Sequence, residues 1–592
     1  MINNDQQGTC KSITVEVALW VLIGVVALAV RLYRVDAAPL SSHEAHEAML
    51  AWRAVSEGLA GVDPQDYSPL LFAVNAGLMA VFGAGDGIVR LWAALCGTGL
   101  ALAPLLFRRR LGRLGALAAG MYLVFSPTAL FASRQVSGAV TAALGGLMAL
   151  AGIVRCLDEE ESSQRLHWIV FSALGLALAV TSSALTYGLL LPVGLVGLFT
   201  LARSGGGQRV WDAIGPYYAR VFTIVALGAA LMLATGMGWH WPGVGAVGDL
   251  LASWLARFRP AEATAASPLG ILVIYEPLLL PLGIGGWVWS LRRSRRLGVL
   301  LGGGALTGLF LLFLMPGRFP LDILWVVLPL AMLAGLGVDC LAENLCRYSD
   351  WLSEGLHTLV VILLWGHLYL ILARYAFSGN SVDLVLALAV VLMQFVMLSV
   401  FTIASGFTAA LRAAAVGTGI VLLGWTISAG WGVAFVRPAD PRELLTHHPS
   451  AGGVRDLVQT LQEISWQERG LPDAASFTYQ TQDLESVLMW YLRDFRNARQ
   501  VASLTAGVPD SLRVTVTDLP GDLEIPLQGL AEEEVIGQDF ALRYGWEREG
   551  LGCTPGWPPQ CWALTRWALF RKTSPAPPVD RWAVLWKTSH SD

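Results

Sequence analysis

Charged residues are scarce in this sequence. Asp, Glu, Lys and Arg make up 14% of the 592 residues, compared with about a quarter in typical soluble proteins. Hydrophobic residues make up 55%, and the mean hydropathy is +0.56. A soluble globular protein is therefore excluded. The formal net charge of −4 says little about partners, because it averages loops on both sides of a membrane.

Two further features are missing from the apolar part of the chain. Its long apolar segments carry almost no acidic residues, and no internal repeat relates one half of the sequence to the other. Secondary transporters typically place charged groups near the membrane midplane and are built from repeated halves. These absences argue against transport, and we expect no nucleic-acid partner.

Long apolar segments fill residues 1–435. A helix needs roughly 20 apolar residues to cross the hydrocarbon layer, and about thirteen segments meet this requirement. They lie near residues 13–32, 88–107, 114–132, 136–154, 166–182, 184–202, 217–238, 269–290, 298–315, 321–341, 356–376, 382–403 and 412–435. Arg31 and Arg34 directly follow the first segment, which favours an uncleaved anchor over a secretory signal. We expect a polytopic α-helical domain over residues 1–435.

Arginine-rich loops orient these spans. Short cytoplasmic loops collect Lys and Arg, and the loops at residues 108–113, 203–209 and 292–296 are rich in Arg. An odd number of spans with a cytoplasmic N-terminus puts all three loops inside. The apolar segment Tyr67–Gly83 would reverse this order if it crossed. We therefore predict an interfacial or re-entrant helix there, within a structured external loop over residues 34–87 that has another short helix near residues 45–57.

The sequence becomes polar after residue 436. Residues 450–467 have helical apolar spacing, "ESVLMWYLRDF" predicts a second helix, and "ASFTYQT" and "LRVTVTD" predict strands. We expect a small α/β domain over residues 436–592 that lies outside the cytoplasmic membrane. Cys553 and Cys561 flank a turn-rich stretch in it, where an oxidising compartment permits a disulfide, and free thiols are the alternative.

The stretch "SSHEAHEAML" places two histidines and two glutamates within five residues. A helical zinc protease needs histidines four residues apart, whereas His43 and His46 are three apart, so this class is excluded. His43 and Glu47 are four apart and share a helix face on which a divalent cation is a candidate cofactor. The alternative is an ordinary solvated helix surface.

Seven short segments carry a resemblance to a known family. They are "HEAHEAMLAWRAVSEG", "YSPLLFAVNAGLMAVFG", "GIVRLWAALCGTGLALAPLLFRRRLG", "ALAAGMYLVFSPTALFASR", "PGRFPLDILWVVLPLAMLAG", "RPADPRELL" and "WYLRDF". The collinear series resembles the GT-C type of membrane glycosyltransferases. It is similar to family 39 enzymes, including protein O-mannosyltransferases and lipid A aminoarabinose transferases. It is most similar to a flippase-activity-associated group of archaea and some bacteria.

The resemblance implies transfer of a sugar from a polyprenyl-phosphate donor, with inversion at the anomeric carbon. The acceptor would be a cell-envelope component or a protein outside the cytoplasmic membrane. Family members carry an Asp-Glu pair after the first span, and the matching residues are His43 and Glu44. Glu44 is then the candidate base, or His43 with a pKa nearer neutrality, and we include Glu47 with them.

The sequence departs from the family at three places. The Asp of the pair is absent, and Gly138 and Ala139 stand where an acid usually follows the first external Ser-Arg. The Glu-Lys that often precedes Pro320 is also missing. These departures keep a second function open, that of a catalytically degenerate relative acting as a subunit or lipid-handling partner in envelope-glycan assembly.

Several residues are candidates for binding the substrate. Arg134 and Arg318 fall at external ends of predicted spans, where arginine suits a lipid phosphate, although interfacial snorkelling is the alternative. Arg90 has a similar place, with pairing to Asp86 or another loop acid as its alternative. The remaining candidates are His240, between two tryptophans in an external loop, and Tyr67.

Overall fold

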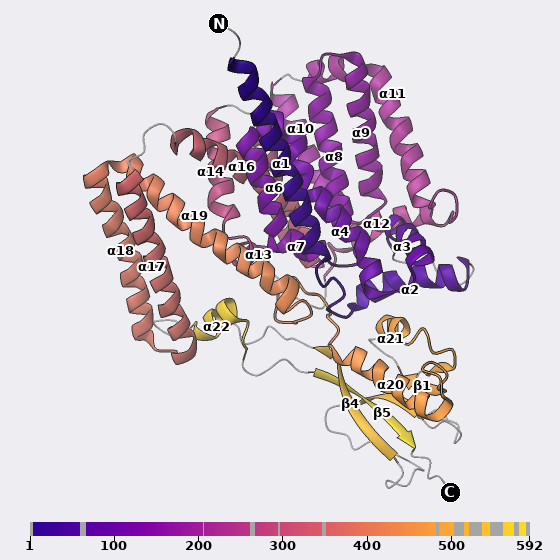
Figure 1. Cartoon of the computed structure of the whole chain (residues 1–592). Coiled ribbons are helices and arrows are strands. Elements are labelled where there is room, and N and C mark those ends of the chain that lie inside the picture. The colour runs from indigo at the N-terminus through magenta and orange to yellow at the C-terminus, as the bar shows by residue number, and fades with distance from the viewer. Residues whose placement is uncertain are drawn as a thin grey trace.

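The computed structural model describes most of the chain. It covers residues 4–59, 67–204, 207–260, 267–293, 296–345, 351–480, 485–501, 514–519, 535–544, 561–573 and 579–587. These residues form a large helical bundle with a small α/β unit at one end (Figure 1). The predicted polytopic helical fold with a C-terminal α/β unit is therefore confirmed.

Eleven helices in the described ranges are long and apolar enough to cross a membrane. They are α1 (Asn4–Leu32), α4 (Asp86–Leu102) with its continuation to Leu111, α8 (Ala139–Asp158), α9 (Ser162–Val180), α10 (Leu185–Ser204), α11 (Gly207–Ala234), α15 (Arg296–Leu314), α16 (Leu324–Leu345), α17 (Trp351–Ser378), α18 (Ser381–Ser405) and α19 (Phe407–Trp431). A twelfth span results if α13 (Pro268–Tyr275) and α14 (Leu279–Arg292), which meet at 99°, are counted together.

Two predicted spans are broken: residues 269–290 form the bent pair α13–α14, and residues 114–132 are also divided. Residues 114–132 form α6 (Arg113–Phe125) and α7 (Pro127–Ala132), and α6 has only 13 residues. The Ser126 side chain accepts a hydrogen bond from the backbone of Ala129, and Pro127 occupies the first turn of α7. A capping serine followed by proline starts a new helix, which explains the break.

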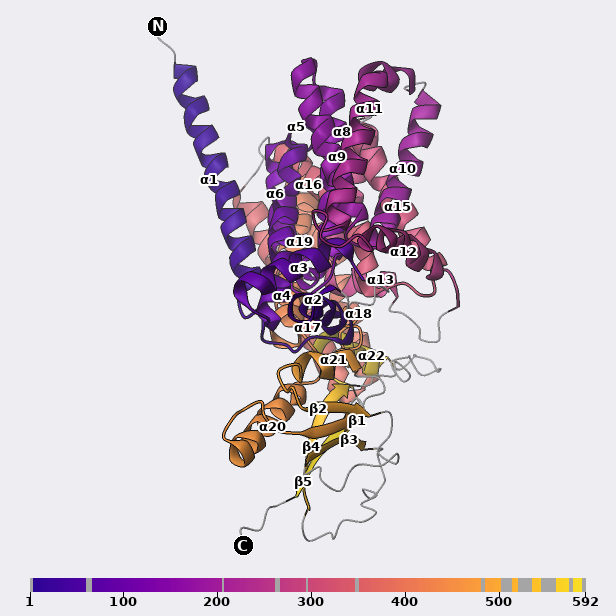
Figure 2. The same ribbon diagram turned by 90° about the vertical axis from the view of Figure 1, so that its right-hand side faces the viewer.

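The two ends of the bundle differ in charge and structure. The N-terminus of α1 and the Arg-rich helix α5 (Arg108–Leu111) lie at one end, where Arg108 pairs with Glu16 of α1. The opposite end carries the short helices α2 (Ser42–Ser56), α3 (Pro69–Phe82) and α12 (Gly243–Ala256), with the α/β unit beyond them (Figure 2). At 14 residues α3 is too short to cross a bilayer, in line with the sequence analysis.

The α/β unit, which we call the tail domain, contains a five-stranded mixed sheet of order β2-β1-β3-β5-β4. Its elements are α20 (Gly453–Arg469), β1 (Phe477–Gln480), α21 (Glu485–Tyr491), β2 (Ala498–Val501), β3 (Val514–Leu519), β4 (Val535–Tyr544) and β5 (Val579–Lys587). The helix α22 (Trp562–Phe570), between β4 and β5 in the sequence, packs instead against α17 (Figure 1). Strand β1 pairs in parallel with β2 and β3, and β5 pairs antiparallel with β3 and β4. Cys561 is disulfide-bonded, whereas Cys553 lies outside the described residues, so their pairing stays a prediction.

Two large groups of buried apolar side chains hold the structure together. The first lies within the bundle. The second joins Ala48 of α2 and Phe72 of α3 to Leu457, Phe477 and Trp490 of the tail domain. The helices α2 and α3 therefore share a hydrophobic core with the tail domain, which fixes their place at the end of the bundle.

Candidate functional site

The stretch that contains the two histidines and two glutamates begins α2. Ser41 caps the helix: its hydroxyl accepts from the backbone of Glu44, and the Glu44 carboxylate accepts from the backbone N–H of Ser41 at 3.0 Å. This reciprocal capping fixes where the helix starts. Glu44 and Glu47, three residues apart, consequently lie on the same side of α2, and each is 3% exposed.

Glu44 forms a bidentate ion pair with Arg90 of α4. The Arg90 guanidinium donates from Nε to Oε1 and from Nη2 to Oε2, both at 2.9 Å. The backbone N–H of Val136 also donates to Oε1, at 2.8 Å. Burial raises the pKa of Glu44, but the charge and hydrogen bonds of Arg90 outweigh it, so the pKa lies below its ordinary value. Such a carboxylate is held ionised and is a poor proton acceptor.

Glu47 has a different environment. Its Oε1 accepts from the backbone N–H of Ser68 at 3.0 Å, and Oε2 has no hydrogen-bond partner among the described residues. Burial raises the pKa of Glu47 to about 8, an effect that the Ser68 hydrogen bond only partly offsets. A carboxylate with one free oxygen and a raised pKa is chemically suited to act as a general base.

A cavity of about 620 Å³ opens beside Glu47. Its walls come from α2, α12, the segment between α7 and α8, and the turn before α16. Nine titratable residues line it: His43, Glu44, Glu47, Tyr67, Asp249, Arg257, Arg259, Asp322 and His447. The cavity therefore combines a candidate base with cationic groups in one space.

The two arginines of the wall were not singled out from the sequence. Arg257 donates to both carboxylate oxygens of Asp322 at 2.8 Å, and its guanidinium lies 4.6 Å from the centre of the Phe319 ring. Arg259 follows two residues later and is exposed. The sequence places both in "RFR" directly after α12, and this motif does not by itself distinguish a binding site from a solvated helix end.

Three arginines predicted to bind phosphate are absent from the residues lining this cavity. Arg134 instead donates to the carbonyls of Val30, Arg31, Tyr33 and Arg34 at the end of α1. Arg318 donates to the carbonyls of Leu312 and Met315 at the end of α15. Both thus cap helix C-termini, where cationic donors are favourable. Arg90 is engaged with Glu44, a pairing with a loop acid that the sequence left open.

Glu44, Arg90 and Arg134 do come together. All three line a second, much smaller cavity of about 30 Å³. This space is about that of one water molecule. The structure therefore gathers these three residues around a space too small for a sugar, and of the three only Glu44 also lines the large cavity.

Tyr67 and His240 form a pair at the wall of the large cavity. His240 Nε2 lies 3.0 Å from the Tyr67 hydroxyl, and His240 is 4% exposed. Burial lowers the pKa of His240 and raises that of Tyr67 to about 12. The Tyr67 side chain borders the cavity while His240 stands behind it, so His240 orients Tyr67.

His43 lines the cavity next to Glu47. Desolvation by the surrounding protein, with the nearby His46, lowers the pKa of His43. Within the ranges that the structure describes, no group of three or more His, Cys, Asp and Glu residues is arranged to hold a metal ion. Binding of a divalent cation by His43 and Glu47 stays a prediction, and no chemical step below depends on it.

The chain was compared with protein families, with curated proteins and with solved structures. No family model matches the sequence. No curated protein matches it. Among solved structures, ArnT from Cupriavidus metallidurans bound to undecaprenyl phosphate is 18% identical. Its match covers 84% of this chain and 92% of ArnT, with a TM-score of 0.52. The apo form of ArnT is also 18% identical over 86% of this chain and 93% of ArnT, with a TM-score of 0.51.

At this level of identity the likeness concerns the fold. Of the thirteen spans predicted from the sequence, the described residues show eleven, or twelve if the bent pair α13–α14 is counted as one. The chain therefore has the GT-C fold.

Proposed function

We propose that this chain transfers a sugar from a polyprenyl-phosphate donor to a cell-envelope or protein acceptor. One observation carries the proposal: Glu47, whose Oε2 has no hydrogen-bond partner among the described residues, lines the same cavity as Arg257 and Arg259. The fold is shared with ArnT, a protein that binds undecaprenyl phosphate. In this proposal the end of the bundle that carries the cavity and the tail domain faces the outside of the cytoplasmic membrane.

The proposed chemistry is a single displacement. The acceptor's nucleophilic atom forms a bond to the anomeric carbon while the bond from that carbon to the phosphate oxygen breaks, which inverts the configuration. Polyprenyl phosphate leaves with the electron pair of the broken bond. Glu47 takes the proton of the acceptor, and Arg259, supported by Arg257, stabilises the negative charge on the leaving phosphate.

The environment of the two glutamates decides their roles. Glu44 occupies the position that the family resemblance assigns to the base, but Arg90 and the backbone of Val136 use its oxygens. Glu47 lies one helical turn further, keeps one oxygen free and has the raised pKa that a base needs near neutral pH. We therefore assign proton abstraction to Glu47 and helix anchoring to Glu44.

The second candidate function is that of a non-catalytic subunit or lipid-handling partner. The observation that favours it is the ion pair between Glu44 and Arg90. The residue at the family's catalytic position has a structural role here, as it would in a relative that had lost activity. Envelope-glycan assembly proteins would then be its partners. The resemblance to family 39 enzymes and to the flippase-associated group is compatible with both functions, because each would be carried out by a protein with the GT-C fold.

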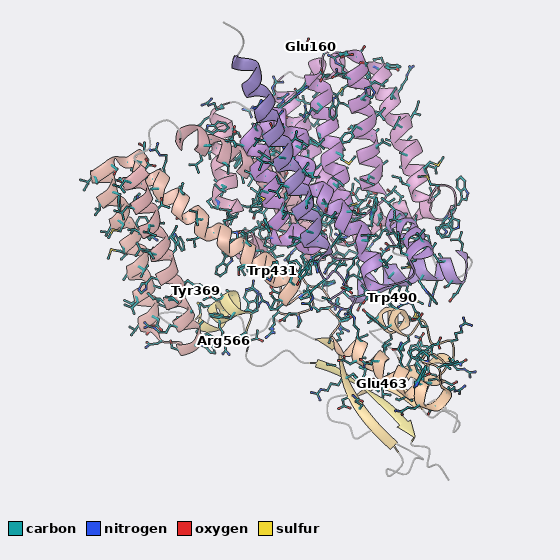
Figure 3. All side chains as sticks on the ribbon, viewed as in Figure 1. Glu160, Tyr369, Trp431, Glu463, Trp490 and Arg566 are labelled. Atoms are coloured by element: carbon teal, nitrogen blue, oxygen red, sulfur yellow. The ribbon has the colours of Figure 1, made fainter. Side chains whose placement is uncertain are left out.

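The test uses the full chain in lipid nanodiscs. Radiolabelled polyprenyl-phosphate sugars are supplied with a membrane acceptor fraction, and transfer is compared for the wild type, Glu47→Gln and Glu160→Gln. Glu160 is exposed at the opposite end of the bundle (Figure 3), which makes it a matched control. We expect Glu47→Gln to lower transfer by about 10²-fold or more and Glu160→Gln to leave it unchanged.

Two results would count against the assignment. Full transfer by Glu47→Gln would remove Glu47 as the base. No transfer by the wild type from any donor supplied, with the protein folded, would favour the non-catalytic subunit.

A further inference from the structure

The segment between α1 and α2 accepts hydrogen bonds from arginines on two sides, the bundle and the tail domain. From the bundle, Arg90 donates to the carbonyls of Val35 and Ala38 at 2.9 and 2.8 Å. From the tail domain, Arg455 of α20 donates to the carbonyls of Asp36 and Ala37 at 2.6 and 3.0 Å. This short connection, which leads directly into the cap of α2, is thus fixed by arginines from both parts of the molecule, with Arg134 of the bundle bonded to the carbonyls of Tyr33 and Arg34 as well.

Asp86, the first residue of α4, gathers three side chains of the tail domain. Its Oδ1 accepts from Trp490 Nε1 at 2.9 Å. Its Oδ2 accepts from the Tyr491 hydroxyl at 2.7 Å and from Arg455 Nη2 at 2.6 Å. The Asp86 side chain is 12% exposed. Both carboxylate oxygens are used, so Asp86 serves as an anchor for the tail domain.

Leu40 links this anchor to α2. Its backbone N–H donates to the Tyr491 hydroxyl at 2.9 Å, and its carbonyl accepts from the Ser450 hydroxyl at 2.7 Å. Leu40 is completely buried and directly precedes Ser41, the cap of α2. Both backbone groups of the residue that leads into the helix are therefore bound by the tail domain.

We propose that the tail domain holds α2 in register with the cavity, with Asp86 and Tyr491 as positioning residues for Glu47. The inference rests on the function proposed above. The shared hydrophobic core sets the distance between α2 and the tail domain, and Trp490 lies where they meet (Figure 3). The hydrogen bonds through Asp86, Tyr491 and Leu40 fix the orientation of α2 relative to the tail domain. A base displaced by about 1 Å can cost about a hundredfold in rate, so this support matters for catalysis.

The decisive variant is Tyr491→Phe in the full chain, in lipid nanodiscs. It keeps the ring in the core but removes the hydroxyl that joins Asp86 to Leu40. Tyr369→Phe is the matched control, because Tyr369 is 42% exposed on α17, far from α2 (Figure 3). Two quantities are measured: amide hydrogen exchange along the chain, and kcat and KM for a polyprenyl-phosphate sugar.

We expect Tyr491→Phe to speed exchange in residues 41–47 roughly tenfold while exchange in the bundle stays the same. It should lower kcat roughly tenfold with KM little changed, because the base is displaced and the donor contacts remain. Asp86→Asn should show the same pattern more weakly.

Unchanged exchange at α2 in both variants would overturn the inference, and so would faster exchange spread evenly over the chain, which indicates general destabilisation. The exchange measurement needs no turnover. Faster exchange at α2 in a protein that transfers no sugar would leave the positioning intact and remove only the proposed function.

Discussion

The surroundings of α2 and the α17–α18 hairpin use charge in opposite ways. Around α2, Glu44, Arg90 and Asp86 are at most 12% exposed on the side chain and are fixed by several hydrogen bonds. In the hairpin, which stands apart from the main bundle in Figure 1, only 11% of the apolar window of α18 is buried. Its Arg374 pairs with Asp383 near the turn, and the Arg374 side chain is 59% exposed.

The difference shows where this protein depends on its polar groups. Exposed ion pairs contribute little to stability, whereas a buried carboxylate is costly unless every oxygen is satisfied. Near α2, two glutamates are buried in distinct environments despite the free-energy cost of burying a carboxylate. The hairpin also holds a buried carboxylate, since the Asp383 side chain is 4% exposed, but Arg374 and Ser378 satisfy both of its oxygens and it does not line the cavity. Substitutions should therefore have large effects near α2 and small effects in the hairpin.

The largest effect should follow from breaking the buried pair at α2. Arg90→Gln leaves the Glu44 carboxylate buried without its partner, which should lower the free energy of unfolding by about 3–5 kcal/mol. Denaturation of the purified protein in nanodiscs measures it. The double variant Glu44→Gln/Arg90→Gln should lose less, since no charge stays buried. Equal stability of the single variant and the wild type would contradict the structural role of the pair.

The pH dependence of transfer should be the next largest effect. With the pKa of Glu47 near 8, the ionised fraction, and with it kcat, should rise about tenfold per pH unit up to that value and level off above it. Because Arg90 holds the pKa of Glu44 below its ordinary value, a mechanism based on Glu44 would give a flat profile between pH 6 and 9, to order of magnitude. A pH–rate profile thus decides between the two glutamates.

The same group should make stability depend on pH. A carboxyl whose pKa is raised in the folded state binds its proton more tightly there than in the unfolded chain. Glu47 should therefore stabilise the fold below its ordinary pKa of 4.5, and this contribution should fall by about 1.4 kcal/mol per pH unit until about pH 8. Melting curves of the wild type and Glu47→Gln test this, since the variant should lack that part of the slope. Parallel curves would contradict the raised pKa.

The smallest effect should come from the hairpin. His357 of α17 stacks on Phe401 with ring centres 4.2 Å apart, and neither ring nitrogen has a hydrogen-bond partner among the described residues. His357→Leu removes these unsatisfied groups, so stability should stay the same or rise slightly, with transfer unchanged. Arg374→Gln leaves the buried Asp383 with the Ser378 hydrogen bond alone, so it should lower stability modestly and leave transfer unchanged. A loss of transfer in either variant would show that the hairpin serves the site, and the comparison would fail.

Local patterns in the sequence predicted much of the fold. The length of the apolar segments predicted most of the spans. The charge of the loops predicted that the segment forming α3 does not span the membrane, in line with its length of 14 residues. The helix α2 and the first elements of the tail domain followed from periodicity. The break between α6 and α7 was not predicted, although Ser126 and Pro127 form a helix start inside the apolar run.

The site was less predictable because its contacts are distant in sequence. Glu44 and Arg90 are 46 residues apart, and nothing local shows that they pair while Glu47 stays free. Arg134 and Arg318 do lie at ends of spans. A span-end arginine can bind a lipid phosphate or cap its neighbouring helix, and only the three-dimensional arrangement separates the two. The role of the tail domain was likewise invisible.

The hydrogen bonds of Leu40 have a consequence for biosynthesis. They join residues 410 and 451 positions apart, so α2 leaves the ribosome long before Ser450 and Tyr491 exist. If the tail domain positions Glu47, a nascent chain can insert all its spans and still have no working base. Activity would then begin only when translation is nearly finished. The order of the chain would itself keep incomplete molecules from consuming lipid-linked sugar.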